Sequence, residues 1–222
     1  MALLTIDFFH DVVCCWSFNI SSRLRMLAVE LDLDIRHRTF VLQGSEREMA
    51  ERWGTPEQAR DTILGHWERC RGVSDRPELV NIKAMRKAPF PYPHGNVAAR
   101  ACKAAEALGG QAAHWDMFDS LQRAHLSEAR DIADRDVVVE IGAAAGFDRD
   151  TFTLLVDAPE TKAAVDADRL YARQLQVTSV PSLIVRQTGN RLVNGPTDDL
   201  RAQITASARL ATFNERAITC AS

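Results

Sequence analysis

The sequence predicts an α/β fold in which one sheet, built from both ends of the chain, is interrupted by a helical insertion. Runs with strand character, rich in aliphatic, aromatic and β-branched residues, lie near the two ends. Between them, apolar residues recur mostly at helical spacing. With 222 residues and a 46% hydrophobic composition, the chain can bury a substantial core without disulfide or metal staples.

The N-terminal segment has the pattern of a β-α-β unit. Residues 3–9 are typical of a buried strand, and apolar residues from Ile20 to Leu31 then follow helical spacing. Residues 35–41 alternate in character and contain β-branched side chains, which favours a second strand beside the first.

Several short helices are predicted for the middle of the chain. Asp134 is expected to cap a helix that Gly146 ends, and Asp148 or Asp150 to cap the next one. Glycine and proline mark the other predicted breaks, at residues 54–56, 72–77, 89–93, 109–110 and 159.

The C-terminal segment predicts a hairpin and a last helix. Residues 182–186 and 191–193 flank a Gly-Asn pair that suits a tight turn, and Thr197 or Asp198 can cap the helix that follows. We therefore expect a discontinuous sheet domain, made of residues 1–43 and 177–222, and a helical insertion domain of residues 44–176.

Composition excludes several classes of function. The formal net charge is −3, and no cluster of Lys and Arg with interleaved aromatic residues suggests a nucleic-acid partner. The sequence contains neither a signal-like N-terminus nor an apolar run of about 18 residues, so we expect a cytoplasmic protein without a membrane partner. A homodimer is left open.

The five cysteines do not predict a disulfide framework, because their number is odd and most of them are scattered. Cys102 lies on an apolar helical face and is expected to be buried, Cys220 is expected to be exposed, and Cys70 has no clear place. We expect free thiols.

Cys14 is the strongest candidate for chemistry, because it lies between the first predicted strand and the first predicted helix. Unpaired N–H groups at a helix N-terminus stabilise a thiolate, so the pKa of Cys14 is expected to fall below the free value of about 8.5. Ser17, three residues later, can cap the helix, donate a hydrogen bond to the Cys14 thiolate, or do both.

The sequence around Cys14 resembles a known family. The run Cys14 to Ser17 after a strand, with residues 178–181 before the hairpin, resembles the thioredoxin superfamily. Residues 11–16, 131–134, 144–148 and 177–181 together resemble the FrnE branch of the DsbA-like family over nearly the whole chain. The resemblance implies a thioredoxin fold with a large inserted α-helical domain, and a cis Val180–Pro181 bond beside Cys14.

One departure from that family changes the expected mechanism. The family usually carries Cys-Pro-Trp-Cys, whereas this chain has Cys15 at the second position and Ser17 at the last, so the resolving thiol is missing. A serine hydroxyl cannot attack a disulfide at neutral pH, and a bridge between adjacent Cys14 and Cys15 would be strained. We therefore expect a monothiol thiol–disulfide oxidoreductase acting on a disulfide-containing protein or small thiol. Glutathione or another low-molecular-weight thiol would be its cosubstrate, with no tightly bound cofactor.

Two other functions stay open at this point. The motif also resembles kappa-class glutathione transferases and 2-hydroxychromene-2-carboxylate isomerases, in which a serine at the nucleophile position hydrogen-bonds the sulfur of glutathione. That resemblance implies a glutathione-dependent enzyme acting on a small aromatic or electrophilic molecule, although this chain keeps Cys14 at the nucleophile position. A thioredoxin-like binding protein without catalysis is the third interpretation.

Around Cys14 and Pro181, we expect four residues to contact the substrate: His10, Trp16, Asn96 and Val180. His10 could tune the thiol, and Trp16 could form an aromatic wall. The Pro-rich segment 89–94 either borders the cleft or is a plain connector. His10, Cys14 and Cys15 lack a fourth ligand and the paired spacing of structural zinc, so no metal site is expected.

Overall fold

The structure is a computed structural model and describes residues 4–219. Within these residues the sheet has four strands in the order β2-β1-β3-β4. The strands β1 and β2 are parallel, whereas β3 pairs antiparallel with both β1 and β4. The bounds of the strands are Thr5–His10 for β1, Asp34–Thr39 for β2, Ser182–Val185 for β3 and Arg191–Leu192 for β4.

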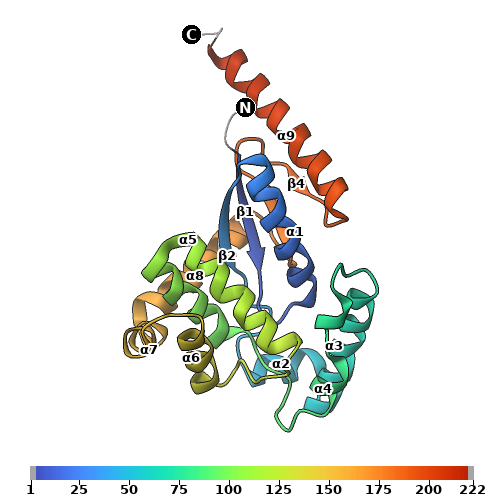
Figure 1. The fold of residues 1–222 in the computed structure, drawn as a ribbon, viewed down its shortest axis with the longest axis vertical. Coiled ribbons are helices and arrows are strands. Elements are labelled where there is room, and N and C mark those ends of the chain that lie inside the picture. Colours follow the sequence, from blue (N-terminus) through green and yellow to red (C-terminus); the bar gives the residue numbers. More distant parts are fainter. Residues whose placement is uncertain (1–3, 220–222) are drawn as a thin grey trace.

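Helices make up most of the rest of the described chain (Figure 1). Their bounds are Cys15–Leu31 for α1, Glu46–Trp53 for α2, Pro56–Arg71 for α3, Pro77–Leu79 for the 3₁₀-helix η1, Ile82–Arg86 for α4, Asn96–Leu126 for α5, Arg135–Ala144 for α6, Arg149–Asp157 for α7, Pro159–Gln174 for α8 and Thr197–Thr219 for α9. The predicted β-α-β opening and C-terminal hairpin are both confirmed. None of the helices in the described part of the chain combines the length and hydropathy needed to cross a membrane.

The strand β1 is an inner strand, between β2 and β3, and is covered on both faces. Its side chains Ile6, Phe8 and Phe9 are fully buried. Burying a large apolar side chain contributes about 1.5–3 kcal/mol. This burial fixes the place of β1, whose carboxyl end leads directly into the Cys14 turn.

Helix boundaries follow the predicted capping residues in the insertion. The Asp134 carboxylate accepts from two backbone N–H groups at the start of α6, and the Asp148 carboxylate accepts from one at the start of α7. The predicted break at Gly109 and Gly110 is a kink, because α5 continues beyond these two residues despite their non-helical dihedrals. Thr197 and Asp198, the two predicted caps of the last helix, both lie inside the first turn of α9 and not before it.

The insertion packs directly on the sheet. Both α5 and α8 contact β2. The carboxylate of Asp168 on α8 accepts from the backbone N–H of Thr39 at 3.0 Å, and it forms ion pairs with Arg38 and Lys103. Figure 1 shows α9 extending from the sheet at the end opposite α2, α4 and α6. The boundaries of the two domains, at residues 43/44 and 176/177, stay a prediction.

Candidate active site

Cys14 lies at the start of α1, as its sequence position predicts. It is the N-cap residue of this helix, with an extended backbone. Its backbone N–H donates to the carbonyl of Asp11 at 3.0 Å, and its own carbonyl accepts from the N–H of Ser17 at 3.0 Å. The turn between β1 and α1 is therefore closed by its own backbone.

The loop before β3 brings Val180 and Pro181 to this turn. The Cys14 Sγ donates to the carbonyl oxygen of Val180 at 3.6 Å. The Val180–Pro181 peptide bond is cis, which is the geometry that the resemblance implied. Cys14 thus meets Val180 and Pro181, although Val180 lies 166 positions away in the sequence.

A cleft of about 270 Å³ opens beside Cys14. The turn at residues 13–16 and the loop at residues 178–180 form one part of its lining, and α2, α3 and Tyr92 form another. Its aromatic walls come from both parts of the chain and are Trp16, Trp53, Trp67 and Tyr92. Trp16 and Val180 therefore lie where a substrate-binding residue is expected.

The expected low pKa of Cys14 is wrong. The thiol belongs to a residue that is only 8% exposed, and this burial raises its pKa to about 11. The nearby Ser17 side chain and backbone N–H lower the pKa and the Asp11 carboxylate raises it, but each of these effects is smaller than that of burial. The backbone N–H groups of Ser17 and Trp16 at the start of α1 lower the pKa by less than burial raises it.

Two buried side chains contact backbone carbonyls in the turn between β1 and α1. Gln122 on α5 donates through its Nε2 to the carbonyls of Val12, at 3.2 Å, and Cys14, at 3.0 Å. The Tyr92 hydroxyl accepts from Trp67 Nε1 at 3.1 Å and lies 3.2 Å from the carbonyl of Val13. No local motif in the sequence identifies either residue.

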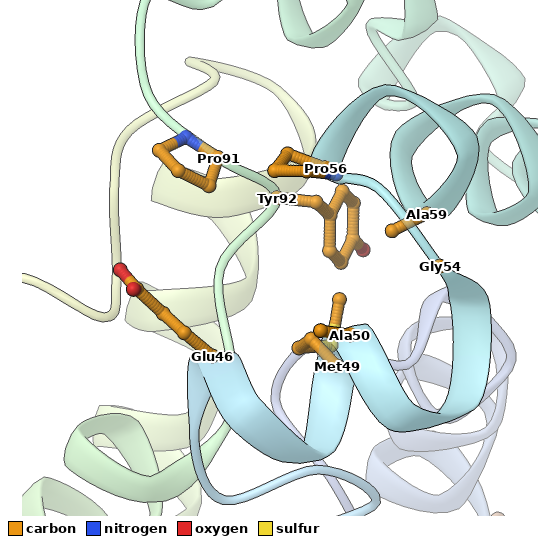
Figure 2. A pocket seen from close by; sticks show the side chains of 8 residues that line it. All are labelled: Glu46, Met49, Ala50, Gly54, Pro56, Ala59, Pro91 and Tyr92. Carbon is orange, nitrogen blue, oxygen red and sulfur yellow. The ribbon is translucent and has the colours of Figure 1, made fainter.

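Tyr92 comes from the Pro-rich segment, which the sequence placed either at the cleft or in a connector. Its ring separates the cleft from a smaller cavity of about 70 Å³. Figure 2 shows this ring between Pro56 at the start of α3 and the side chains of Met49 and Ala50 on α2. The segment borders the cleft through Tyr92.

Comparison with known proteins gives the family. The model of the DsbA-like thioredoxin domain matches residues 5–205. The chain belongs to this family. The thioredoxin fold with an inserted helical region is thereby confirmed.

Solved structures agree with this fold. DsbM, a cytosolic disulfide reductase from Pseudomonas aeruginosa, has a TM-score of 0.73 and 24% identity, over 93% of this chain and 100% of that chain. A protein disulfide isomerase candidate from Nitrosomonas europaea has a TM-score of 0.78 and 18% identity, over 94% of this chain and 99% of that chain. A 2-hydroxychromene-2-carboxylate isomerase has a TM-score of 0.63 and 16% identity, over 96% of this chain and 98% of that chain. At these identities the likeness concerns the fold. No curated protein sequence matches this chain.

Ser17 occupies the position of the second cysteine in the DsbA-like motif. It is completely buried, and its hydroxyl has no conventional hydrogen-bond partner among the described residues. The expected helix cap through this hydroxyl is therefore not found. The side chain nevertheless lies close enough to Cys14 to lower the pKa of its thiol.

Cys15 points to a different neighbour, Cys70 on α3. The Cys15 thiol donates to the Cys70 sulfur, which raises the pKa of Cys15 well above its ordinary value and lowers that of Cys70. Asn19 also donates to the Cys70 sulfur, at 3.3 Å. Both cysteines are free and buried, as is Cys102, whose burial was predicted. Cys220 lies outside the described residues.

Asp11 ties the DsbA-like turn to the insertion. Its carboxylate accepts from the N–H of Leu42 at 2.5 Å and from the N–H of Val13 at 3.2 Å. Burial raises its pKa to about 6. Gly95, just before α5, approaches so closely that a Cβ there would lie 2.4 Å from Asp11 Oδ1.

Two residues predicted to bind substrate are not in the lining of the cleft. His10 is 1% exposed, and its ring contacts His37 and His114 in the core. Asn96 is the first residue of α5 and also lies outside the lining. Strand alternation explains His10, because successive side chains at the end of β1 point to opposite faces.

Proposed function

We propose that this protein is a thiol–disulfide oxidoreductase that uses Cys14 by a monothiol route. The observation that carries the proposal is the position of Cys14. Its thiol lies at a helix N-terminus, against the loop of Val180 and Pro181, and in the wall of a cleft. Membership in the DsbA-like family supports the same chemistry.

The reaction has two exchange steps. In the first, the Cys14 thiolate attacks one sulfur of a disulfide, the S–S bond breaks, and the other sulfur leaves as a thiolate that takes up a proton. In the second, an external thiolate attacks the substrate sulfur of this mixed disulfide and releases Cys14, which regains its proton. Ser17 cannot act as the resolving nucleophile, but its buried hydroxyl can donate a hydrogen bond to the Cys14 sulfur.

The resting form of Cys14 is the protonated thiol. With a pKa of about 11, about one molecule in ten thousand carries the thiolate at pH 7. A thiolate with a high pKa is the stronger nucleophile, which offsets part of this loss. We therefore expect exchange that is slow at neutral pH and limited by thiolate formation.

The cleft suits a small thiol with carboxylate groups. Arg52 lies in its lining and stacks on Trp53, with 5.0 Å between the guanidinium carbon and the ring centroid. Such a cation can pair with a carboxylate of glutathione, while Trp16 covers the peptide. The DsbM structure has also been solved with GSH. We propose glutathione or another low-molecular-weight thiol as the cosubstrate, a disulfide-containing protein or small thiol as the partner, and the cytoplasm as the location.

A second function is favoured by the same high pKa. A Cys14 thiol that stays protonated can donate a hydrogen bond to a bound thiolate instead of attacking a disulfide. The cleft would then hold glutathione reversibly for isomerisation or transfer on a small aromatic or electrophilic molecule. The structural likeness to 2-hydroxychromene-2-carboxylate isomerase supports this alternative.

Intact-mass analysis with peptide mapping separates the two functions. Reduced protein is treated with oxidised glutathione and then with reduced glutathione. One adduct at Cys14 that reduced glutathione removes supports thiol–disulfide exchange. Noncovalent binding of reduced glutathione without any Cys14 adduct supports the second function. Cys15→Ser is the matched control, because it removes the adjacent thiol and keeps Cys14.

A further inference from the structure

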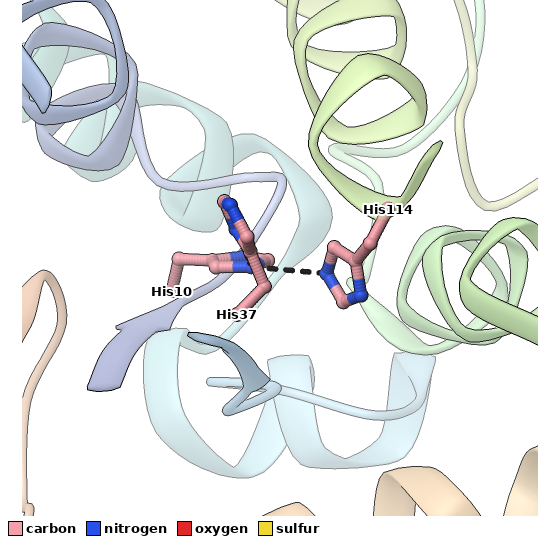
Figure 3. Close-up of side chains that lie close together, drawn as sticks. All are labelled: His10, His37 and His114. Carbon is pink, nitrogen blue, oxygen red and sulfur yellow. Dashed lines mark hydrogen bonds between the residues drawn. The ribbon is translucent and has the colours of Figure 1, made fainter. Parts of the chain in front are cut away.

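Three buried histidines meet in the core, away from the cleft. His10 ends β1, His37 lies in β2, and His114 lies in α5 beyond its kink. Figure 3 shows the His114 ring directed at the two rings from the strands. The Nε2 of His10 is 3.3 Å from Nδ1 of His37 and 3.2 Å from Nε2 of His114.

The three imidazoles cannot satisfy one another as neutral rings. The Nδ1 of His114 is 2.8 Å from Oε2 of Glu106, and an ionised carboxylate only accepts, so His114 Nδ1 carries the proton and Nε2 presents a lone pair. His10 Nε2 therefore faces this lone pair on one side and Nδ1 of His37 on the other. A single N–H on His10 cannot make a good hydrogen bond to both.

The outer ring nitrogens provide no alternative. His10 Nδ1 and His37 Nε2 are buried and have no hydrogen-bond partner among the described residues. Proton placement alone thus leaves polar atoms unpaired in a core lined by Phe8, Phe118 and Trp115.

A metal ion would satisfy the three inner nitrogens, which face one another. The outer nitrogens of His10 and His37 would then carry the ring protons. An ion about 2.0–2.1 Å from each of its imidazole nitrogens in a tetrahedral site separates these nitrogens by about 3.3 Å. The two nitrogen distances to His10, 3.3 and 3.2 Å, match this spacing, and all three ligand atoms lie within 4.8 Å of one another.

We propose that His10, His37 and His114 bind one divalent transition-metal ion of the zinc type. The ligand atoms are Nε2 of His10, Nδ1 of His37 and Nε2 of His114. Imidazole ligands favour zinc and its neighbours, copper and nickel, over magnesium and calcium, which prefer oxygen. The three histidines supply three of the four ligands of a tetrahedral ion, so the fourth would be water or another small ligand.

One carboxylate next to the cluster, that of Glu106, suits a bound cation. Glu106 orients His114 in the carboxylate–histidine–metal arrangement common in zinc sites. The ammonium of Lys103 lies close to this carboxylate but also pairs with Asp168, at 2.7 Å, so its charge is shared between two anions. A bound ion would join both parallel strands to α5 and so fasten the insertion to the sheet. The proposal is independent of the reaction at Cys14.

Cobalt substitution tests the site directly, because Co²⁺ reports its ligands by absorption. The full chain is unfolded in denaturant that contains a chelator, so that any bound metal is removed. It is then refolded with Co²⁺, and Zn²⁺ is added as a competitor. We expect one Co²⁺ per chain, visible bands of a tetrahedral ion with nitrogen ligands, and displacement by Zn²⁺. Failure to take up Co²⁺ or Zn²⁺ overturns the proposal. A sulfur-to-metal charge-transfer band also overturns it, because it would place the ion on cysteines.

Matched histidine variants locate the ion. His37→Ala and His114→Gln should lose stoichiometric binding, whereas His125→Gln, at an equally buried histidine outside the cluster, should keep it. Glu106→Gln should weaken binding by about 10–100-fold. If the ligand variants do not fold, X-ray absorption of the zinc-loaded wild-type protein decides the matter. A shell containing histidine nitrogen without sulfur supports the site, and any sulfur ligand overturns it.

Discussion

His10 and Cys14 are four residues apart, yet they belong to opposite environments. His10 points into the core, where β2 and α5 supply two further imidazoles, whereas Cys14 borders a cleft that contains cationic and aromatic side chains. The sequence suggested one site containing both residues. The difference shows that partners from distant segments, and not sequence neighbours, determine the chemistry of each residue.

Removal of the Cys14 thiol, which borders the cleft, is the strongest test of the difference between these two environments. Cys14→Ser should reduce thiol–disulfide exchange to the uncatalysed background, because a hydroxyl does not attack a disulfide. The measurement is turnover of a small mixed disulfide with glutathione. Cys15→Ser should retain turnover, since the Cys15 thiol is directed to Cys70. Full activity in Cys14→Ser would refute the proposed mechanism.

The pH profile of Cys14 tests whether burial dominates on the cleft side. Because the pKa is about 11, the alkylation rate of Cys14 should rise about tenfold per pH unit from pH 7 to pH 10. Peptide mapping separates this rate from those of the other cysteines. Asp11→Asn should shift the profile to lower pH, because the Asp11 carboxylate raises the pKa of the thiol. A plateau below pH 9 would mean that the helix N-terminus overcomes burial.

Asp11 lies between the two environments and should make stability depend on pH. Its pKa rises on folding from 3.8 to about 6, so between these values the folded state holds the extra proton. The free energy of unfolding should therefore fall as pH rises from about 4 to about 6, by about 3 kcal/mol in total. Urea denaturation across this range measures the effect. The difference between wild type and Asp11→Asn isolates Asp11 from other carboxylates, and equal slopes in the two proteins would contradict this assignment.

Gly95 tests how closely the insertion approaches the same turn. A Cβ at this position would lie 2.4 Å from the Asp11 carboxylate, which is held by hydrogen bonds from the N–H groups of Leu42 and Val13. Gly95→Ala should therefore destabilise the protein by about 1–3 kcal/mol. The control is Gly65→Ala in α3, where a Cβ meets nothing within 4 Å. That control should be neutral or stabilising by up to about 1 kcal/mol, because alanine favours helix. Equal losses in both variants would exclude the close approach as the cause.

The strands and the reactive turn could be predicted from local sequence, because hydrophobic spacing and capping residues act over a few positions. Asp134 and Asp148 illustrate this, since their helices begin where predicted. The pKa of Cys14 could not be predicted in this way. Its burial depends on Val180 and on helices of the insertion, which no motif near residue 14 reveals.

Several site residues could not be predicted from the sequence for the same reason, because their partners come from distant segments of the chain. Cys70 and Gln122 act on the turn across long stretches of chain, and His37 and His114 join His10 only after β2 and α5 have packed together. Glu106 gave no local signal, because residues eight apart are not neighbours on a regular helix and it is the kink at Gly109 and Gly110 that brings Glu106 to His114.

Tyr92 gives the smallest expected effect and tests the support of the turn. Tyr92→Phe removes a buried hydroxyl that accepts from Trp67 and lies within hydrogen-bond distance of Val13, so Trp67 Nε1 loses its acceptor. We expect a loss of about 1–2 kcal/mol in the free energy of unfolding, measured by urea denaturation. Tyr171→Phe, at the only other tyrosine, should cost less, because Asp7 keeps its partners Arg38 and Arg186. If Tyr171→Phe cost more, the turn would be held chiefly by Gln122 and Asp11.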